Sequence, residues 1–181
     1  MSAQLILCFI AADKPGLVDA LSKAISECGG NWLESRMAHM AEKFTGIIRV
    51  ELPDRERAEG LMAQLATLER DGFNIMVSDA REQAEPTGSP LEIDLVGSDQ
   101  PGIVQDITHC LATHRVSIEK MDTYTADAPM GGGILFHAHF DLRAPSGFDE
   151  AALHAELEQL ANALMVDLDL HERDAVAAKP G

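Results

Sequence analysis

A six-residue segment occurs twice in this chain, and an internal repeat constrains the fold more strongly than any other feature. Residues 13–18 are Asp-Lys-Pro-Gly-Leu-Val, and residues 99–104, 86 positions later, are Asp-Gln-Pro-Gly-Ile-Val. At average residue usage, four identities in one register arise by chance with a probability on the order of 10⁻⁵. An apolar stretch precedes each copy, at residues 5–10 and 91–96. The sequence therefore predicts two copies of one structural unit.

The hydrophobic pattern predicts the same order of elements in each copy. An apolar strand leads into Asp-x-Pro-Gly, a helix follows with apolar residues at helical spacing, and two strands, a second helix and a last strand complete the copy. The later strands are expected at residues 31–40, 44–52, 73–77, 116–125, 134–142 and 166–170. The order β-α-β-β-α-β, found twice, predicts an α+β fold of two tandem ferredoxin-like units. Each unit is expected to be an antiparallel sheet with its helices on one face.

Polar stretches set the expected domain boundaries. Residues 82–90 are rich in Pro and Gly and predict a linker between domain 1 (1–81) and domain 2 (91–172), and residues 173–181 predict a flexible tail. The hairpin of the second copy is the longer one and holds three consecutive glycines at 131–133. This loop is either a flexible hairpin tip or a flap over a ligand.

The charge balance excludes several kinds of partner. The 181 residues include 14 Lys and Arg against 30 Asp and Glu, a formal net charge of −16. Binding to DNA or to an anionic membrane depends on basic side chains, so neither is expected. No apolar run approaches the roughly 18 residues of a transmembrane helix. The odd set of Cys8, Cys28 and Cys110 lies among apolar neighbours, which predicts buried structural thiols in a reducing, cytoplasmic compartment.

The Asp-x-Pro-Gly segment starts a helix directly after a strand. The unpaired N–H groups of a helix N-terminus, together with the macrodipole, favour a carboxylate or phosphate group. A small amino acid could place its carboxylate there and its ammonium group against Asp13 or Asp99. Each aspartate could equally cap its helix, in which case the motif is structural. Both interpretations stay open at this point.

Other candidate constellations are weaker. His137 and His139 share one face of a strand, but zinc takes three or four protein ligands and no third one has suitable spacing. Asn31 and Ser35, beside the single tryptophan Trp32, are polar enough to line a pocket. No Gly-x-Ser-x-Gly, His-Glu-x-x-His, Walker A or Gly-x-Gly-x-x-Gly motif occurs. The sequence therefore predicts a protein that is not an enzyme and that uses no cofactor and no metal.

The repeated element order with Asp-x-Pro-Gly after the first strand resembles the ACT domain, a small ligand-sensing module of amino-acid metabolism. In its tandem arrangement the chain is similar to the glycine cleavage system transcriptional repressor family. This resemblance is carried by the two Asp-x-Pro-Gly segments, by residues 30–37 (Gly-Asn-Trp-Leu-Glu-Ser-Arg-Met) and by residues 128–130 (Ala-Pro-Met). It implies that ACT domains pair, within the chain or in a homodimer. It also implies that a small amino acid, with glycine as the candidate, binds at the seam between them.

The resemblance, together with the turn chemistry, marks fourteen positions for ligand binding: Asp13, Pro15, Gly16, Leu17, Val18, Asn31, Ser35, Asp99, Pro101, Gly102, Ile103, Val104, Pro129 and Met130.

The resemblance also implies a mode of action. Such a regulator opposes a separate DNA-binding activator through protein contact, which accords with the negative charge of this chain. Two alternatives stay open: an ACT regulatory subunit of a metabolic enzyme, and an enzyme similar to the formyltetrahydrofolate hydrolases, whose N-terminal part resembles a tandem ACT unit. The second copy has Ser-Ile-Glu-Lys-Met at 117–121 where the first has Asn-Trp-Leu-Glu-Ser at 31–35, so the two seams are not expected to be equivalent.

Overall fold

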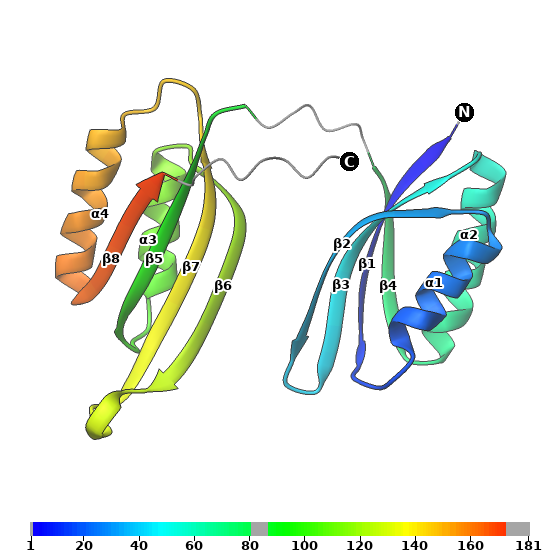
Figure 1. Ribbon diagram of the computed structural model, residues 1–181, viewed down its shortest axis with the longest axis horizontal. Coiled ribbons are helices and arrows are strands. Elements are labelled where there is room, and N and C mark those ends of the chain that lie inside the picture. The colour runs from blue at the N-terminus through cyan, green and yellow to red at the C-terminus, as the bar shows by residue number, and fades with distance from the viewer. Residues whose placement is uncertain (1, 81–86, 173–181) are drawn as a thin grey trace. The chain divides into compact units, whose positions relative to one another are not determined.

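The first unit is a four-stranded antiparallel sheet with two helices, and its strands alternate apolar and polar residues. The computed structural model describes residues 2–80 and 87–172; the predicted tail at 173–181 and most of the predicted linker at 82–90 lie outside them. In the first unit the elements are β1 (Ala3–Ala12), α1 (Leu17–Glu27), β2 (Asn31–Met40), β3 (Lys43–Leu52), α2 (Arg55–Arg70) and β4 (Phe73–Asp79). The strands pair antiparallel in the order β2-β3-β1-β4, and both helices cover one face of the sheet (Figure 1).

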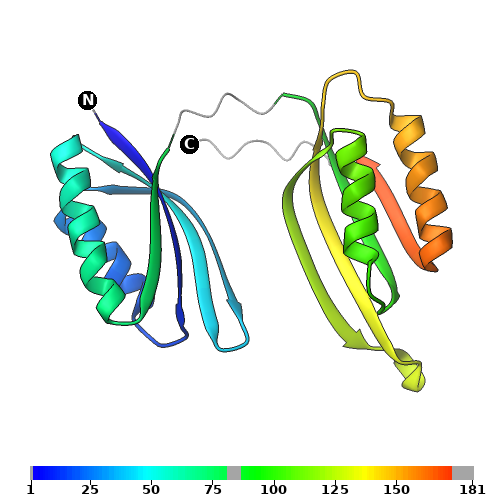
Figure 2. The ribbon, with the colours of Figure 1, turned by 180° about the vertical axis from the view of Figure 1, so that it is seen from behind.

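The second unit repeats this architecture. Its elements are β5 (Ser89–Ser98), α3 (Ile103–Thr113), β6 (Ser117–Asp127), the short 3₁₀ helix η1 (Pro129–Gly131), β7 (Ile134–Ala144), α4 (Glu150–Leu164) and β8 (Val166–Glu172). The sheet order is β6-β7-β5-β8, again antiparallel, with α3 and α4 on one face (Figure 2). The predicted fold class, two tandem ferredoxin-like βαββαβ units, is confirmed. The sequence pattern did not predict η1.

The core of each unit lies between the sheet and its helices. Along β1, Leu5, Leu7, Phe9 and Ala11 are buried toward the helices, since side chains of a strand alternate between its faces. Trp32 packs at the margin of this core. The second unit has a separate core of the same design. Of the helices in the described part of the chain, none is long and apolar enough to span a membrane.

The alternation also corrects one expectation about the cysteines. Cys28 and Cys110 are buried as predicted, whereas Cys8 is only partly buried. Cys8 lies between the core residues Leu7 and Phe9, so its side chain points to the sheet face that no helix covers. All three cysteines are free thiols.

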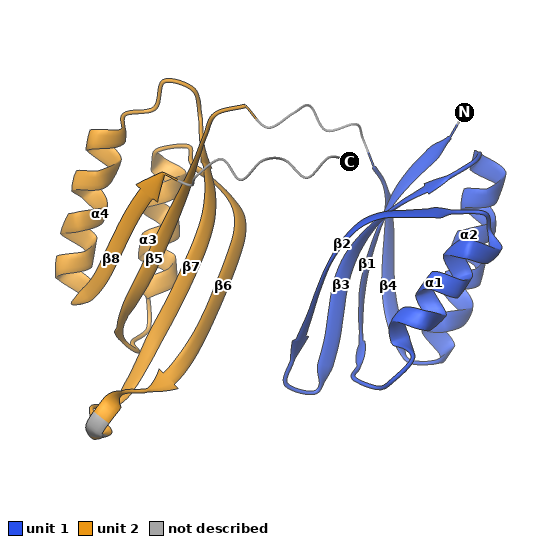
Figure 3. Ribbon diagram, in the orientation of Figure 1, with its two compact units in different colours: residues 1–83 blue, residues 84–181 orange. Residues whose placement is uncertain are grey.

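The chain divides into two compact units, Met1–Gln83 and Ala84–Gly181 (Figure 3). Strand β5 begins at Ser89, so Ser89 and Pro90, assigned to the linker from their composition, belong to the second sheet. Pro90 pairs with Arg143 of β7, and among the described residues β8 pairs with β5 from Leu91 onward. A proline, which has no N–H donor, is tolerated at such a position near the start of a strand.

The four helices begin in two different ways. Asp54 caps α2 by accepting a 2.8 Å hydrogen bond from the Arg57 N–H, and Asp149 caps α4 by accepting one of 2.9 Å from the Ala152 N–H. In contrast, α1 and α3 have Gly16 and Gly102 at the N-cap and receive no hydrogen bond from a capping side chain.

The capping assignment predicts a difference between two aspartates of the first unit. Replacing a capping aspartate by alanine costs about 1 kcal/mol, so Asp54→Ala should lower the urea midpoint of this unit by roughly 0.3–1 M. Trp32 is the only tryptophan and packs on the core of this unit, so its fluorescence reports the transition. The control is Asp13→Ala, which removes no cap and should shift the midpoint by much less. Equal shifts in the two variants would contradict the assignment.

Candidate functional site

The repeated turn brings the chain into each first helix through a left-handed glycine. Gly16 has φ +94° and Gly102 has φ +103°, a backbone conformation that residues with a side chain adopt only under strain. A Cβ atom on Gly16 would have no neighbour within 4 Å, so the requirement for glycine there comes from the backbone and not from packing. The helix dipole and the first N–H groups of α1 and α3 therefore face outward without a side-chain cap.

Asp13 and Asp99 lie beside these turns, and neither caps its helix. The Asp13 N–H donates to the Glu42 carbonyl at 3.0 Å, and the Asp99 N–H donates to the Ile134 carbonyl at 2.9 Å. Each turn is thus tied through its aspartate to the neighbouring β-hairpin. The Asp13 carboxylate lies 3.4 Å from Nε2 of His39. Neither aspartate caps its helix, so the capping interpretation is wrong, whereas the backbone hydrogen bonds of Asp13 and Asp99 give both residues a structural role in the turn.

The variable residue of Asp-x-Pro-Gly has a structural role in both copies. Nζ of Lys14 donates to the carbonyl of Asp71 at 3.1 Å, at the C-terminal end of α2. Nε2 of Gln100 donates to the carbonyl of Leu164 at 2.6 Å, at the end of α4. Two different side chains therefore fasten the turn to the end of the second helix of their own unit.

A pocket of about 240 Å³ opens at the turn of the first unit. It is lined by Asp13, Lys14, Gly16, Leu17, Val18, Asp19 and Phe44. Four of these residues, Asp13, Gly16, Leu17 and Val18, were predicted for ligand binding from the sequence. Lys14, Asp19 and Phe44 were not predicted: Phe44 enters from β3, which only the sheet pairing brings beside the turn. The lining thus combines two carboxylates, one ammonium group and the open N-terminus of α1.

The other predicted positions are distributed as follows. Leu17 and Ile103 are core residues, so only their backbone can serve a ligand at the turn. Asn31 pairs with Glu51 at the end of β2 remote from the turn, and Ser35 pairs with Ile48 in the middle of the sheet. Within the first unit the structure therefore does not bring Asn31 or Ser35 to the pocket.

In the second unit, the hairpin that holds Pro129 and Met130 lies at the same end of the sheet as Asp99. Pro129 and Met130 form η1 between β6 and β7, and the Asp99 N–H bonds to Ile134 at the start of β7. Pro15 and Pro101 are exposed in their turns, and Val104 is 36% exposed. The Gly102 turn and this hairpin are therefore neighbours, as expected for a flap or a hairpin tip.

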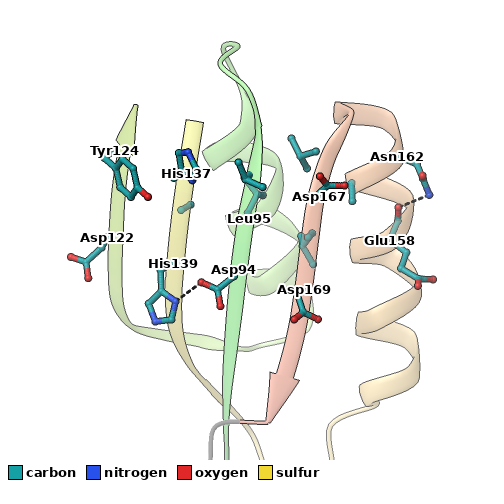
Figure 4. Close-up of a pocket in the computed structure, with 15 residues that line it drawn as sticks. Asp94, Leu95, Asp122, Tyr124, His137, His139, Glu158, Asn162, Asp167 and Asp169 are labelled. Carbon is teal, nitrogen blue, oxygen red and sulfur yellow. Dashed lines mark hydrogen bonds and ion pairs between the residues drawn. The ribbon is translucent and has the colours of Figure 1, made fainter. Parts of the chain in front are cut away.

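A second pocket, of about 770 Å³, lies on the outer face of the second sheet and extends over β8 to α4 (Figure 4). Its ionisable and aromatic lining residues are Asp94, Asp122, Tyr124, His137, His139, Glu158, Asp167 and Asp169. The Tyr124 and His137 rings stack with centroids 4.6 Å apart. The sequence placed His137 and His139 on one face of a strand but did not predict this pocket, although the charged residues alternate along β5, β7 and β8, a pattern that places them on one face.

His139 contacts two carboxylates on this face. Its Nδ1 lies 2.8 Å from the Asp94 carboxylate, and its Nε2 lies 3.3 Å from that of Asp141. The hydrogen bond with Asp94, with the charge of both carboxylates, raises the pKa of His139 above the usual 6.5, although burial opposes the shift. The imidazolium is therefore favoured on this face.

The two buried thiols are poor nucleophiles. Burial raises the pKa of Cys110 to about 11, with the nearby Glu156 carboxylate adding to the effect. Burial also raises the pKa of Cys28. Because the thiolate is the reactive form, neither cysteine is activated for covalent chemistry at neutral pH.

These features define a protein of two ferredoxin-like units, each with an uncapped helix at its strand-to-helix turn. The chain belongs to the ACT domain family, whose model matches residues 3–77 and 89–171.

The chain is also similar to individual proteins. It is 24% identical over 168 residues to the glycine cleavage system transcriptional repressor of Escherichia coli (strain K12), covering 91% of this chain and 85% of that protein. Its fold is similar to that of a protein of unknown function from Galdieria sulphuraria, with a TM-score of 0.82, 25% identity and coverage of 96% and 100%. It is also similar to that of a candidate glycine cleavage system transcriptional repressor, with a TM-score of 0.67, 18% identity and coverage of 96% and 99%.

The geometry around His139 predicts a specific pKa change. In Asp94→Asn the pKa of His139 should fall toward 6.5, because the shorter of its two carboxylate contacts is lost. The matched control, Asp141→Asn, should lower the pKa less. The imidazole signal of His139 in a pH titration by NMR measures both. Equal pKa values in the wild type and Asp94→Asn would contradict this account.

The raised pKa of His139 also determines how the stability of the second unit depends on pH. His139 stabilises the folded second unit fully below the ordinary histidine pKa, and this contribution is lost as the pH rises through the pKa of the folded state. The free energy of unfolding should therefore fall over that interval in the wild type. In His139→Gln the fall should be smaller.

Proposed function

We propose that this protein is a non-enzymatic, amino-acid-sensing regulator. A small amino acid, with glycine as the candidate, binds at the turn between β1 and α1 of the first unit and changes how the protein contacts a partner protein. The observation that carries the proposal is the 240 Å³ pocket at an uncapped helix N-terminus in a member of the ACT domain family.

The lining of the pocket favours a zwitterion. The α-carboxylate of an amino acid would accept hydrogen bonds from the N–H groups at the start of α1, where the dipole favours negative charge. Its ammonium group would face the carboxylates of Asp13 and Asp19. A phosphate dianion would be attracted by the helix N-terminus, but the carboxylates of Asp13 and Asp19 would repel it. It is therefore the poorer ligand. A volume of about 240 Å³ also lies below the roughly 300–1,000 Å³ of pockets for drug-sized molecules, which favours a small ligand.

The second turn repeats the backbone geometry of the first with different surroundings. Gly102 and Asp99 match Gly16 and Asp13, and the proposed contacts there are Pro101, Ile103, Val104 and the hairpin residues Pro129 and Met130. Asn31 and Ser35 would reach a ligand only across an interface between domains, since they lie away from the turn of their own unit. The first turn is therefore the primary site in this proposal.

The proposed mode of action is protein contact. A net charge of −16 opposes direct binding to DNA, so a regulator of transcription with this composition acts through a DNA-binding activator. The similarity to a transcriptional repressor of the glycine cleavage system supports this choice of partner. The alternative is an ACT regulatory subunit that controls a metabolic enzyme. We propose a homodimer, because in the described part of the chain each sheet ends in edge strands that can pair with another chain. We propose a cytoplasmic location, because the three cysteines are free thiols.

The ligand proposal is tested by thermal unfolding with each of the twenty amino acids. A ligand that binds only the folded state stabilises it by about 2.7 kcal/mol at 100 times its Kd, and we expect glycine to raise Tm. In Gly16→Ala a methyl group enters the pocket lining, and glycine binding should weaken about 10-fold or more, as for the loss of one hydrogen bond to a charged group.

Gly72→Ala is the matched control for this variant. Gly72 also has φ +94° and open space around its Cβ position, and it does not line the pocket. Both variants should lose about 1–2 kcal/mol of stability from the left-handed backbone, but only Gly16→Ala should lose the response to glycine. A response that survives in Gly16→Ala would show that this turn is not the site.

The partner proposal is tested by affinity purification of the full chain with and without glycine. Recovery of a DNA-binding protein in amounts that depend on glycine supports the proposed regulator, and recovery of a large catalytic subunit supports the alternative. The purified chain alone should not retard DNA in a mobility assay. Retardation at physiological salt would contradict action through a partner.

A further inference from the structure

Three potential metal ligands meet where α3 ends against α4. Sγ of Cys110, Nε2 of His114 and a carboxylate oxygen of Glu156 all lie within 4.8 Å of one another. Cys110 is buried, the His114 side chain is 17% exposed, and that of Glu156 is 45% exposed. The cluster is thus closed on the thiol side and open to solvent on the carboxylate side. It lies at the opposite end of α3 from Gly102, so it is separate from the proposed amino-acid site.

Helix geometry explains why these residues meet. Cys110 and His114 are four positions apart and therefore lie on one face of α3, with His114 as its C-terminal cap residue. The two helices pack side by side against the sheet (Figure 2), and Glu156 projects from the second turn of α4. The three ligands thus come from two elements that the core of the second unit already holds together.

We propose that Cys110, His114 and Glu156 form a binding site for Zn²⁺, with water in the fourth position. Thiolate, imidazole and carboxylate are the three ligand types that zinc takes in proteins, and three protein ligands plus water is a common coordination set. Binding releases one proton, that of the Cys110 thiol, which the metal replaces on sulfur.

The distance between His114 and Glu156 requires only a small adjustment. Nε2 of His114 and Oε2 of Glu156 are 2.8 Å apart in a hydrogen bond. Two ligand atoms about 2.1 Å from a tetrahedral zinc are roughly 3.4 Å apart, so metal binding would part this pair by about 0.6 Å. Since Glu156 is partly exposed, its side chain can make this movement without disturbing the core.

The first unit lacks the same ligands. The 86-residue offset between the copies places Ala24 at the position of Cys110 and Cys28 at the position of His114. In the second helix of each copy the offset is 92 residues, as the pairs Leu61/Leu153 and Leu65/Leu157 show. This offset places Gln64 at the position of Glu156. This set offers a thiol but no imidazole or carboxylate, so the first unit serves as a natural control within the chain.

Another cluster, Glu92, His139 and Asp141, also has ligand atoms within 4.8 Å of one another. Both ring nitrogens of His139 are already engaged there, with Asp94 and Asp141. This cluster contains no thiol, and a metal there would have to part His139 from a carboxylate just as it parts His114 from Glu156 in the α3–α4 cluster. We therefore assign the zinc site to the α3–α4 cluster, and the sheet cluster becomes the competing location in the test.

The test titrates the reduced full chain with Zn²⁺ by calorimetry, using a phosphine reductant, and repeats the titration with Co²⁺. We expect one metal ion per chain and, with cobalt, a thiolate-to-metal charge-transfer band. Changing a residue next to a metal ligand typically costs 10–100-fold in affinity, so loss of a ligand itself should cost about 100-fold or more in Cys110→Ser and His114→Gln. Glu156→Gln keeps the size of the side chain at an exposed position, and it should also weaken binding.

Three controls make the result decisive. Cys28→Ser removes the buried thiol of the first unit, His109→Gln removes an exposed histidine of α3, and His139→Gln removes the histidine of the sheet cluster. All three should keep the wild-type affinity and the charge-transfer band. Binding that is absent at millimolar zinc, that persists in both Cys110→Ser and Glu156→Gln, or that is lost in His139→Gln would overturn the assignment.

Discussion

The left-handed glycine between the first strand and the first helix is the constraint on which each unit depends. Gly16 and Gly102 let β1 and β5 turn directly into α1 and α3, without residues that would cap these helices. The helices that follow the hairpins, α2 and α4, are instead capped by Asp54 and Asp149. The cap of α2 and of α4 satisfies one of the first N–H groups and places a carboxylate there, whereas an uncapped helix leaves these N–H groups open to an anionic ligand. The same feature that makes the turn possible therefore leaves a binding position open at it.

The two copies keep their helix-facing residues alike and differ on the opposite faces of their sheets. On the uncovered face of the first sheet, Ile10 is 43%, Ile47 44% and Met76 69% exposed, so that face carries several exposed apolar side chains. The second sheet has Asp94, His139 and Asp169 on the corresponding strands. The core restricts the inward residues because a close-packed interior tolerates little change in volume. The uncovered faces carry no such restriction, so any division of roles between the copies is expected there and at the turns.

Periodicity and turn chemistry were sufficient to predict the strands, the helices and the fold class, because these are local properties repeated in two copies. They also placed four lining residues of the small pocket, since Asp13 to Val18 are consecutive. What they missed depends on contacts distant in sequence: Phe44 joins the pocket through sheet pairing, and Glu156 meets His114 across 42 positions. Asn31 and Ser35 were chosen for their polarity and because they lie in a segment that carries the resemblance, and the register of β2 places them away from the turn. Burial of Cys8 was wrong because apolar neighbours in a strand belong to the opposite face.

The size of the proposed ligand limits how such a sensor can work. Glycine has five non-hydrogen atoms, and the best small ligands gain about 1.5 kcal/mol per such atom, so its binding free energy is at most roughly 7 kcal/mol. That corresponds to a Kd no tighter than the micromolar range. Moving a two-state equilibrium from 1:99 to 99:1 needs about 5.5 kcal/mol of differential affinity, most of this total. One glycine per chain can therefore act as a complete switch only if most of its binding energy distinguishes the two states. Occupation of both turns, or of both chains in a dimer, divides this demand among more ligands, which gives a physical reason for a regulator to contain two copies of the same unit.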